Sequence, residues 1–438
     1  MSLYSFCRCK YTIIFSIKYY LCKEMNVLYW LNIIKVHNFV VHKVVNLVFF
    51  TYLCIKNNKY NFIMDKPFIY GMSVEGNNFT DREKETKRLK KDFENGINVI
   101  LISPRRMGKT SLVKKVRSEI DNPEIKIVMM DIYDCRSEYD FYNRFASSII
   151  KETAGRMELV MDNIKKFLVR VSPKISFSPE PMSEYSLVLG ITPENYSPEE
   201  ILNLPETIAK EKGIHIVVCI DEFQQIGEMP DTLSLQKKMR GIWQHHTHVS
   251  YCLYGSKKHL MTNLFHNKRM PFYQFGETNE LLVIKTEDWI PFIKEKFASR
   301  KLVISDEYAA RICDYVGNHS SYVQQLAWNV MVETNREVDE ESFAWGCTAL
   351  LSQCHSYFLE QIKGMSSYQM NFIRILCSGF TKNFSSKAAQ DLYPLGSKSN
   401  ISRIKSALIE RELIEELSDG TIRLSDTVFQ KWFTKEWM

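Results

Sequence analysis

A Gly-Lys-Thr tripeptide, at residues 108–110, lies between a strand pattern and a helix pattern in the segment VILISPRRMGKTSLVKKV (99–116). The run INVILI (97–102) is continuous, apolar and rich in β-branched residues, which is typical of a strand covered on both faces of a parallel sheet. SLVKKVRSEI (111–120) has the pattern of a helix. A strand, a loop with this tripeptide and a helix form the context that a phosphate-binding loop requires. The sequence therefore predicts an α/β fold with a parallel-sheet P-loop NTPase core.

The usual pattern of a phosphate-binding loop is a glycine, four residues and then Gly-Lys-Ser/Thr, and here Ser103 replaces the first glycine. Loop N–H groups and the positive end of the helix dipole would face the phosphates. Lys109 would neutralise the β- and γ-phosphates, and the Thr110 hydroxyl would hold Mg²⁺. The predicted nucleotide-binding residues are Ser103, Pro104, Arg105, Arg106, Met107, Gly108, Lys109, Thr110 and Ser111.

An acidic pair follows a second apolar run, in GIHIVVCIDEFQQI (213–226). Asp221 at the end of this strand would bind Mg²⁺, and Glu222 would polarise the water that attacks the γ-phosphate. Acidic pairs after apolar strands are common, so the pair alone has little specificity and is equally typical of an exposed strand end. Together with the upstream loop, it predicts a P-loop NTPase that uses ATP and Mg²⁺.

Three further residues are candidates for the same site. VSYCLYGS (249–256) is a buried-strand pattern, and Ser256 at its end either senses the γ-phosphate or belongs to a plain strand-end turn. Arg269, in the loop KRMPFYQFGE (268–277), is a candidate cation for the charge of the transition state. Arg240, in the helical stretch LQKKMRGIWQHH, is the other candidate.

The body of the chain divides into three predicted domains. The P-loop ATPase core occupies 64–283, and its first helix is expected over 79–94, where Thr80 and Glu83 have the spacing of a capping box. Four helical patterns from residue 286 predict an all-helical lid domain over 284–363. Three helical patterns and a hairpin with an Asp-Gly turn predict a winged helix-turn-helix domain over 364–438.

The winged helix has two interpretations. Lys398, Arg403 and Lys405 on its third helix would face outward, as in a DNA-binding domain. Acidic residues crowd the end of that helix and the hairpin, which favours a domain that packs against protein; these are Glu410, Glu412, Glu415 and Glu416. The sequence leaves both alternatives open.

Residues 1–63 differ in composition from the rest of the chain. They contain no Gly, Ala, Pro, Asp or Gln and carry eight Lys or Arg against one acidic residue, whereas the remainder is close to neutral. This composition is typical of translated AT-rich leader DNA, so we expect an overextended gene start with the natural start at Met64. The alternative is a disordered segment or weak membrane anchor, but the apolar run VVNLVFFTYLCI (44–55) is shorter than a bilayer span.

The cysteines and the overall charge indicate the compartment and partners. Eleven cysteines occur without metal-binding CxxC spacing, which favours free thiols in a reducing cytoplasm. No stretch is a convincing secretory signal, and we expect no membrane association. The near-neutral body gives no argument for nucleic-acid binding from charge alone.

Six stretches occur in an order that resembles prokaryotic ATPases of the AAA+/STAND branch, the archaeal-type ATPases with many bacterial relatives. These stretches are NNFTDREKE, ISPRRMGKTSLV, VVCIDEFQQI, YCLYGSKKHLM, PFYQFGE and HSSYVQQLAWNV, and the resemblance covers about 68–438. It implies an ATP-binding protein with a phosphate loop at Gly108, Lys109 and Thr110, and a sensor at Ser256. The stretch HSSYVQQL resembles the lid segment that covers the nucleotide, although Ser320 stands where proline is usual and no arginine there serves as a second sensor.

Three functions compete on this sequence. The first is an ATPase that hydrolyses ATP to ADP and phosphate and acts as a nucleotide-controlled switch on a protein partner. The second is a DNA-binding regulator or initiator that uses the winged helix. The third is a nucleotide-binding scaffold with negligible turnover. The sequence does not decide the partner or whether the chain forms oligomers.

Overall fold

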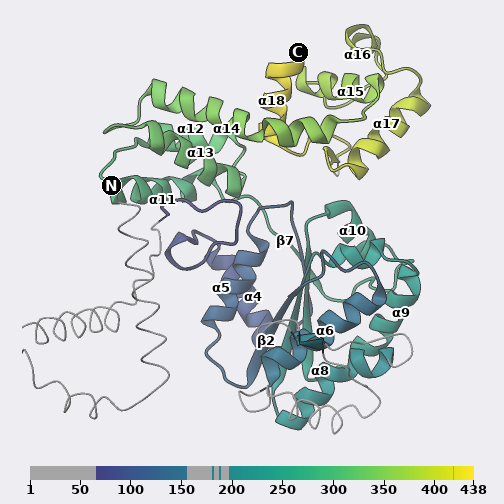
Figure 1. The fold of residues 1–438 in the computed structure, drawn as a ribbon. Helices are drawn as coiled ribbons and strands as arrows, with labels where there is room; N and C mark the ends of the chain where they lie inside the picture. The colour runs from purple at the N-terminus through teal and green to yellow at the C-terminus, as the bar shows by residue number, and fades with distance from the viewer. Residues whose placement is uncertain (1–65, 155–179, 182–186, 189–196, 418) are drawn as a thin grey trace, which may run out of the picture. The chain divides into compact units, whose positions relative to one another are not determined.

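Five parallel strands form the central sheet, in the order β2-β5-β6-β1-β7 (Figure 1). The strands are β1 (Val99–Ile102), β2 (Ile125–Asp131), β5 (His215–Asp221), β6 (Val249–Gly255) and β7 (Glu277–Glu280). All residues of β1 and β6 are buried, as their apolar sequences require. The predicted α/β fold with a parallel sheet is therefore confirmed, and the carboxyl ends of its strands meet at one edge.

This description rests on a computed structural model that covers residues 66–154, 180–181, 187–188, 197–417 and 419–438. The expectation about residues 1–63 lies outside these ranges. Residues Lys66–Met438 form one unit by their internal contacts. Within the part of the chain that is covered, no helix combines the length and the apolar character that crossing a bilayer demands.

Alternating strand residues face two layers of helices. Val99 and Leu101 pack with α4 (Glu83–Glu94) and α5 (Lys109–Glu119), whereas Ile100 and Ile102 pack on the opposite face. That opposite face is covered by α6 (Glu138–Thr153), α8 (Pro198–Lys212), α9 (Thr232–Trp243) and α10 (Lys258–His266). Because successive side chains of a strand point to opposite faces, one apolar run supplies both halves of the core. Two short 3₁₀ helices, η1 (Gly76–Asn78) and η2 (Phe223–Glu228), complete this region.

The edge strand β7 was not expected, because its sequence, Glu-Thr-Asn-Glu, is polar throughout. It pairs with β1 in parallel register, and Gly276 before it lies so close to Asn98 that an added Cβ would be 2.4 Å from the Asn98 carbonyl oxygen. An edge strand keeps one side open to solvent and needs no apolar run.

The predicted capping box at Thr80 and Glu83 is wrong. Helix α4 begins at Glu83 after Arg82, whose backbone is left-handed with φ of 70° and whose side chain makes no cap. Arg82 is 3% exposed, pairs with Glu85 and donates to the Met107 carbonyl at 3.4 Å. This contact with the Gly-Lys-Thr loop is a tertiary one that a sequence pattern does not report, and the helix starts later than the expected range of 79–94.

Ten elements follow the sheet. The range predicted as the lid holds α11 (Thr286–Ser299), α12 (Asp306–Tyr315), α13 (Ser320–Glu333) and α14 (Glu340–Ile362). The range after it holds α15 (Ser367–Cys377), α16 (Lys387–Leu392), α17 (Lys398–Glu410), β8 (Ile414–Glu416), β9 (Ile422–Leu424) and α18 (Thr427–Trp437). The expected three helices and hairpin are present, while its identification as a winged helix-turn-helix domain stays a prediction.

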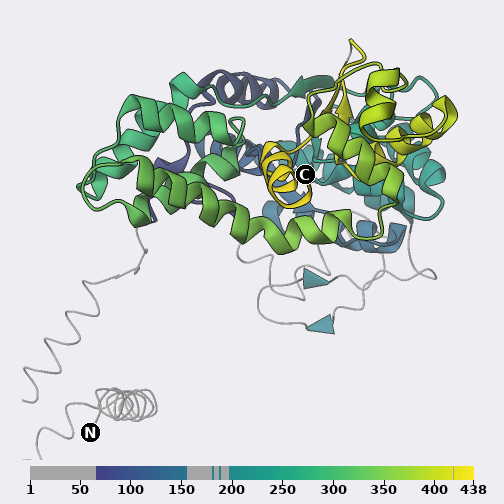
Figure 2. The same ribbon diagram turned by 90° about the horizontal axis from the view of Figure 1, so that it is seen from above.

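The last helix, α18, had not been anticipated and joins the two helical ranges. Figures 1 and 2 both show α18, in yellow, beside α14, in green. Phe358 of α14 packs edge-on against Phe429, and Trp432 Nε1 donates to His355 Nδ1 at 3.0 Å. The apolar side chains of both ranges form one continuous core. This core continues across residue 363, and the domain boundaries expected at 283 and 363 stay predictions. A short antiparallel pair is formed by β3 (Glu180–Pro181) and β4 (Leu187–Val188).

Replacing Glu206 is expected to destabilise the sheet. This buried carboxylate on α8 accepts hydrogen bonds from the backbone N–H groups of Thr247 and His248, just before β6. Burial raises its pKa, but these bonds outweigh the burial and lower the pKa to about 2. In Glu206→Gln, the amide NH₂ group would face the backbone N–H donors of Thr247 and His248, and one of the two hydrogen bonds would be lost. We expect the free energy of unfolding, measured by urea denaturation at pH 7, to fall by about 1–3 kcal/mol.

The pH dependence of that effect has a defined sign. Because the folded pKa of Glu206 lies below the unfolded value, its stabilisation is complete above about pH 4.5 and is lost toward pH 2. The difference in unfolding free energy between the unsubstituted chain and Glu206→Gln should therefore become smaller as the pH falls from about 4.5 to 2. Glu199→Gln, at an exposed site on the same helix, is the control and should change stability by less than about 0.5 kcal/mol. A constant difference at all pH values would contradict the role of the charge.

Candidate nucleotide site

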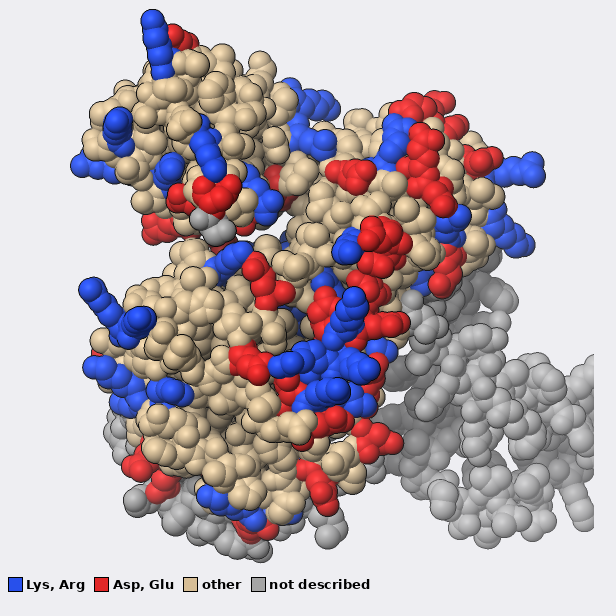
Figure 3. All heavy atoms as spheres, turned by 180° about the vertical axis from the view of Figure 1, so that it is seen from behind, with Lys and Arg blue, Asp and Glu red and all other residues tan. Residues whose placement is uncertain are grey.

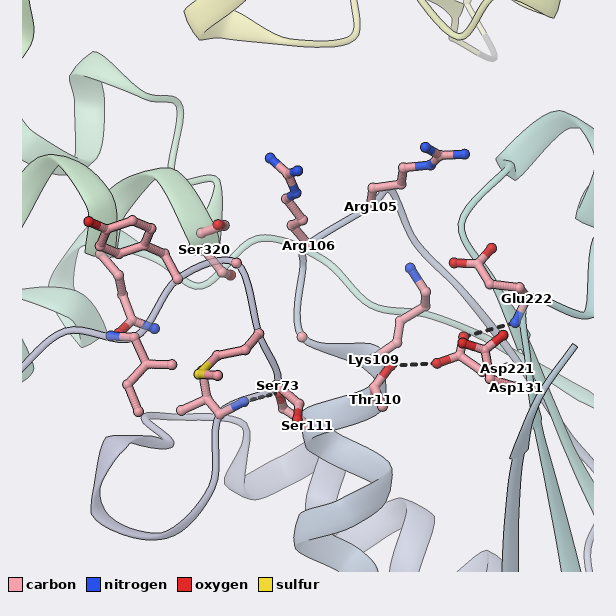
Figure 4. A pocket seen from close by; sticks show the side chains of 18 of the residues that line it. Ser73, Arg105, Arg106, Lys109, Thr110, Ser111, Asp131, Asp221, Glu222 and Ser320 are labelled. Carbon is pink, nitrogen blue, oxygen red and sulfur yellow. Dashed lines mark hydrogen bonds between the residues drawn. The ribbon is translucent and has the colours of Figure 1, made fainter. Parts of the chain in front are cut away.

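A cavity of about 460 Å³ opens at the carboxyl ends of the strands (Figure 4). Its wall comes from the loop before α5, the ends of β2 and β5, the start of α13, and the segment 69–74, which we call the strap. The lining residues are Ile69, Tyr70, Gly71, Met72, Ser73, Val74, Arg105, Arg106, Gly108, Lys109, Thr110, Ser111, Asp131, Tyr133, Asp221, Glu222, Ser320, Ser321 and Gln324. Most of the predicted loop residues therefore line one cavity with the acidic pair.

The loop before α5 closes on the side chain of its own lysine. Lys109 Nζ donates to the carbonyl oxygens of Ser103 at 2.7 Å and Pro104 at 2.9 Å. Gly108 has a φ of +94°, a conformation that favours glycine, whereas buried Ser103 is not among the positive-φ residues. Serine at the first position of the pattern is therefore compatible with the loop. Met107 is buried beneath it.

Burial sets the protonation of the lysine. Lys109 is 6% exposed, and desolvation lowers its pKa to about 8, although Glu222 and Asp221 oppose that shift. A buried ammonium group gains most from a nearby anion, because the low dielectric weakens its solvation and strengthens the attraction. The site is therefore built to take a negatively charged group.

Thr110 and Asp221 meet across the cavity, although 111 positions separate them in the chain. Thr110 Oγ1 donates to Asp221 Oδ2 at 2.6 Å. Burial raises the pKa of Asp221 to about 6, and the Thr110 bond opposes this. Burial also raises the pKa of Asp131, which lies beside Asp221 in Figure 4. A hydroxyl and carboxylates are the oxygen ligands that Mg²⁺ prefers, so the donor set fits this metal.

Glu222 has different partners from its neighbour. Its backbone is left-handed, with φ of 54°, and its Oε2 accepts from Ser256 Oγ at 2.8 Å and from Gln224 Nε2. A non-glycine residue in this conformation carries strain, which is typical of functional sites. Figure 4 shows the Glu222 carboxylate facing the Lys109 side chain.

The two candidate cations lie outside the cavity. Arg269 is exposed in the turn after α10, where its backbone N–H donates to Asn267. Arg240 stacks on Phe275, with the guanidinium carbon Cζ 5.0 Å from the centre of the ring. Neither side chain lines the cavity within this single chain, so a role of Arg269 or Arg240 as the cation for the transition state stays a prediction. Arg105 and Arg106 line the cavity beside Lys109.

The strap was missed by the sequence analysis. Ile69 N donates to Gln324 Oε1 at 2.8 Å, and Val74 N donates to Ser111 Oγ at 2.8 Å. The strap therefore connects α13 with α5 across the cavity. The acceptors Gln324 and Ser111 both lie in stretches that the sequence had singled out, but the strap itself does not, because backbone N–H donors leave no signal in the sequence.

A family model described as an ATPase domain predominantly from Archaea matches residues 79–326. A Walker-type ATPase of Pyrococcus abyssi has a TM-score of 0.63 and 16% identity, with 84% of this chain and 99% of that chain covered. The ORC2 protein of Aeropyrum pernix, in ADPNP–ADP complexes, has a TM-score of 0.51 and 13% identity, with 86% and 98% covered. The search of curated proteins found no match.

Proposed function

This chain belongs to the family of ATPase domains found predominantly in Archaea, and from that premise we propose that it binds ATP with Mg²⁺ and hydrolyses it to ADP and phosphate. One observation carries the proposal: Lys109, Thr110, Asp221 and Glu222 come from distant stretches and meet at a single cavity. Phosphate-loop ATPases need a cation for the phosphates, oxygen ligands for a metal and a base for water, and these four residues supply them.

Each residue has a separate role in this proposal. Lys109 and the loop N–H groups, with Arg105 and Arg106 beside them, hold the phosphate chain. Thr110 and Asp221 hold Mg²⁺, which when bound neutralises charge on the β- and γ-phosphates. Glu222 accepts a proton from the water that attacks the γ-phosphate, and Ser256 acts through Glu222 because its hydroxyl donates to that carboxylate.

A switch role is supported by contacts between the loop and the helices after the sheet. His319, before α13, makes a 3.0 Å hydrogen bond with the Arg105 carbonyl oxygen, and its ring lies against Tyr322. Tyr322 in turn donates to Asp426 Oδ2 at 2.9 Å, at the start of α18. We propose that changes at the phosphate loop reach α18 through these three residues, so that ATP and ADP favour different arrangements.

The test of ATP hydrolysis is a single-turnover assay on the full chain. Radiolabelled ATP at a concentration below that of the protein should be converted to ADP when Mg²⁺ is present, and EDTA should stop the conversion. Tight ATP binding with no ADP formed over hours would favour the nucleotide-holding scaffold. No ATP binding with or without Mg²⁺ would refute the nucleotide site.

DNA binding is the second candidate. Lys398 and Arg403 of α17 are exposed, as a DNA-facing helix requires, whereas Lys405 is half-buried. Figure 3 shows one face of the molecule, on which Lys and Arg side chains lie among Asp and Glu side chains. Four glutamates at the end of α17 and in the hairpin favour the protein-packing alternative; these are Glu410, Glu412, Glu415 and Glu416.

A double substitution tests the DNA-binding candidate. Arg403→Ala with Lys405→Ala should lower affinity for all DNA sequences and reduce the slope of log affinity against log salt by about two, because each phosphate contact contributes about one. The measurement is a fluorescence-anisotropy titration at several salt concentrations, with Lys382→Ala, on the loop beside the hairpin, for comparison. No retention of DNA by the unsubstituted chain at low salt would leave protein packing as the role of this range.

We propose a cytoplasmic location, which is supported by seven free cysteines among the residues that the structure describes. A protein partner or a second copy of the chain would supply any cation that the cavity takes from outside, and Arg269 is exposed on the surface for such a role.

A further inference from the structure

The side chain of Gln224 is buried against Glu222, in the turn η2 that follows β5. Its Nε2 donates a hydrogen bond to Glu222 Oε2, and Ser256 Oγ donates to the same oxygen at 2.8 Å. Gln224 is 2% exposed and Ser256 is 4% exposed. Two buried donors from the ends of two neighbouring strands therefore hold one oxygen of this carboxylate.

The other end of the Gln224 amide has no partner. Gln224 Oε1 is buried and accepts no hydrogen bond among the described residues. It also fills the space beside Gly255, where an added Cβ would lie 2.0 Å from this oxygen. The glycine that precedes Ser256 thus leaves room for the amide.

Packing does not explain a glutamine at this position. A buried amide whose carbonyl oxygen is unpaired costs folding free energy, because that oxygen has lost its hydrogen bonds to water. Methionine has a similar length and would fill the same space without that cost. What methionine lacks is the N–H donor, and among the residues that the structure describes the partner of that donor is Glu222.

We propose that Gln224 is a positioning residue for Glu222, an inference that rests on the proposed hydrolysis of ATP. The Gln224 amide and the Ser256 hydroxyl hold Oε2, so that Oε1 receives the proton. In that step the attacking water gives one proton to Oε1, its oxygen forms a bond to the γ-phosphorus, and the bond from that phosphorus to the β,γ-bridging oxygen breaks. A base must lie within hydrogen-bond reach of the water, and small displacements are costly.

Gln224→Met is the central variant. We expect single-turnover ATP hydrolysis to slow by about 10- to 100-fold, because a displaced base loses much of its effect, while the ATP dissociation constant changes less than about twofold. The unfolding temperature should stay the same or rise, since the unpaired carbonyl oxygen is removed. Gln225→Met makes the same chemical change at the adjacent, half-buried position and should hydrolyse ATP at the unsubstituted rate.

A second measurement separates positioning from a general structural role. In a chain that already carries Glu222→Gln, adding Gln224→Met should slow hydrolysis no further, because the group that Gln224 holds is no longer a base. Equal slowing in both backgrounds, an unchanged rate in Gln224→Met alone, or a parallel loss of ATP affinity would overturn the inference. If the unsubstituted chain binds ATP without hydrolysing it, the proposed hydrolysis fails and the positioning role fails with it. If the unsubstituted chain hydrolyses ATP and Gln224→Met does so at the same rate, only the positioning role fails.

Discussion

Replacing Lys109 with alanine is expected to weaken ATP binding by about 10- to 100-fold. Lys109 is the buried cation of the loop, and a hydrogen bond to a charged group contributes about 1.5–3 kcal/mol, or up to about two decades of affinity. The fold should tolerate the change, because burial already penalises the ammonium group, as its pKa of about 8 indicates. Titration with a fluorescent ATP analogue and a thermal unfolding curve measure the two effects.

The control for this prediction is Lys115, which lies nearly two turns further along α5. Lys115 pairs with Glu119 at the surface and does not line the cavity. Lys115→Ala should therefore bind the analogue with unchanged affinity. Retained affinity in Lys109→Ala would contradict the nucleotide site itself, whereas equal losses in both variants would point to a general effect of charge on the helix.

The core of the fold was predictable because buried parallel strands have a simple sequence signal. β1, β5 and β6 are covered on both faces and are almost entirely apolar, so their runs stand out. β7 has no such signal, because it lies at the edge and pairs only with β1. Its position is set by pairing and by the close approach of Gly276 to Asn98, which are tertiary facts.

The candidate site likewise contains residues that the sequence could predict and residues that it could not. Lys109 and the Asp221–Glu222 pair were predictable because each belongs to a local motif whose residues act together. The strap was not predictable, because it joins α13 to α5 through backbone N–H groups that any residue possesses. Arg82 was assigned to a helix interior, but its contact with the Met107 carbonyl, formed only in the folded chain, fixes its left-handed backbone.

Asp221→Asn is expected to weaken Mg²⁺-dependent ATP binding while sparing binding without metal. Asp221 Oδ2 accepts from the Thr110 hydroxyl, so the carboxylate lies where it and Thr110 would share a metal. Asparagine keeps the shape and one acceptor oxygen but removes the charge that favours a divalent cation. The measurement is the ATP dissociation constant with Mg²⁺ and with EDTA. The ratio of the two should fall toward one in the variant, and an unchanged ratio would remove Asp221 from the metal site.

Glu222→Gln is expected to leave ATP binding intact and to slow hydrolysis by about 100-fold or more, the size of a general-base effect. Although Glu222 is adjacent to Asp221, its side chain bonds to Ser256 and not to Thr110, so its loss should affect the water and not the metal. Glutamine keeps the shape and an acceptor for the Ser256 hydroxyl but cannot take a proton. The variant should therefore accumulate bound ATP, which single-turnover hydrolysis and nucleotide extraction measure directly. Hydrolysis at the unsubstituted rate would mean that another group is the base, because the glutamine amide is too weakly basic to replace the carboxylate.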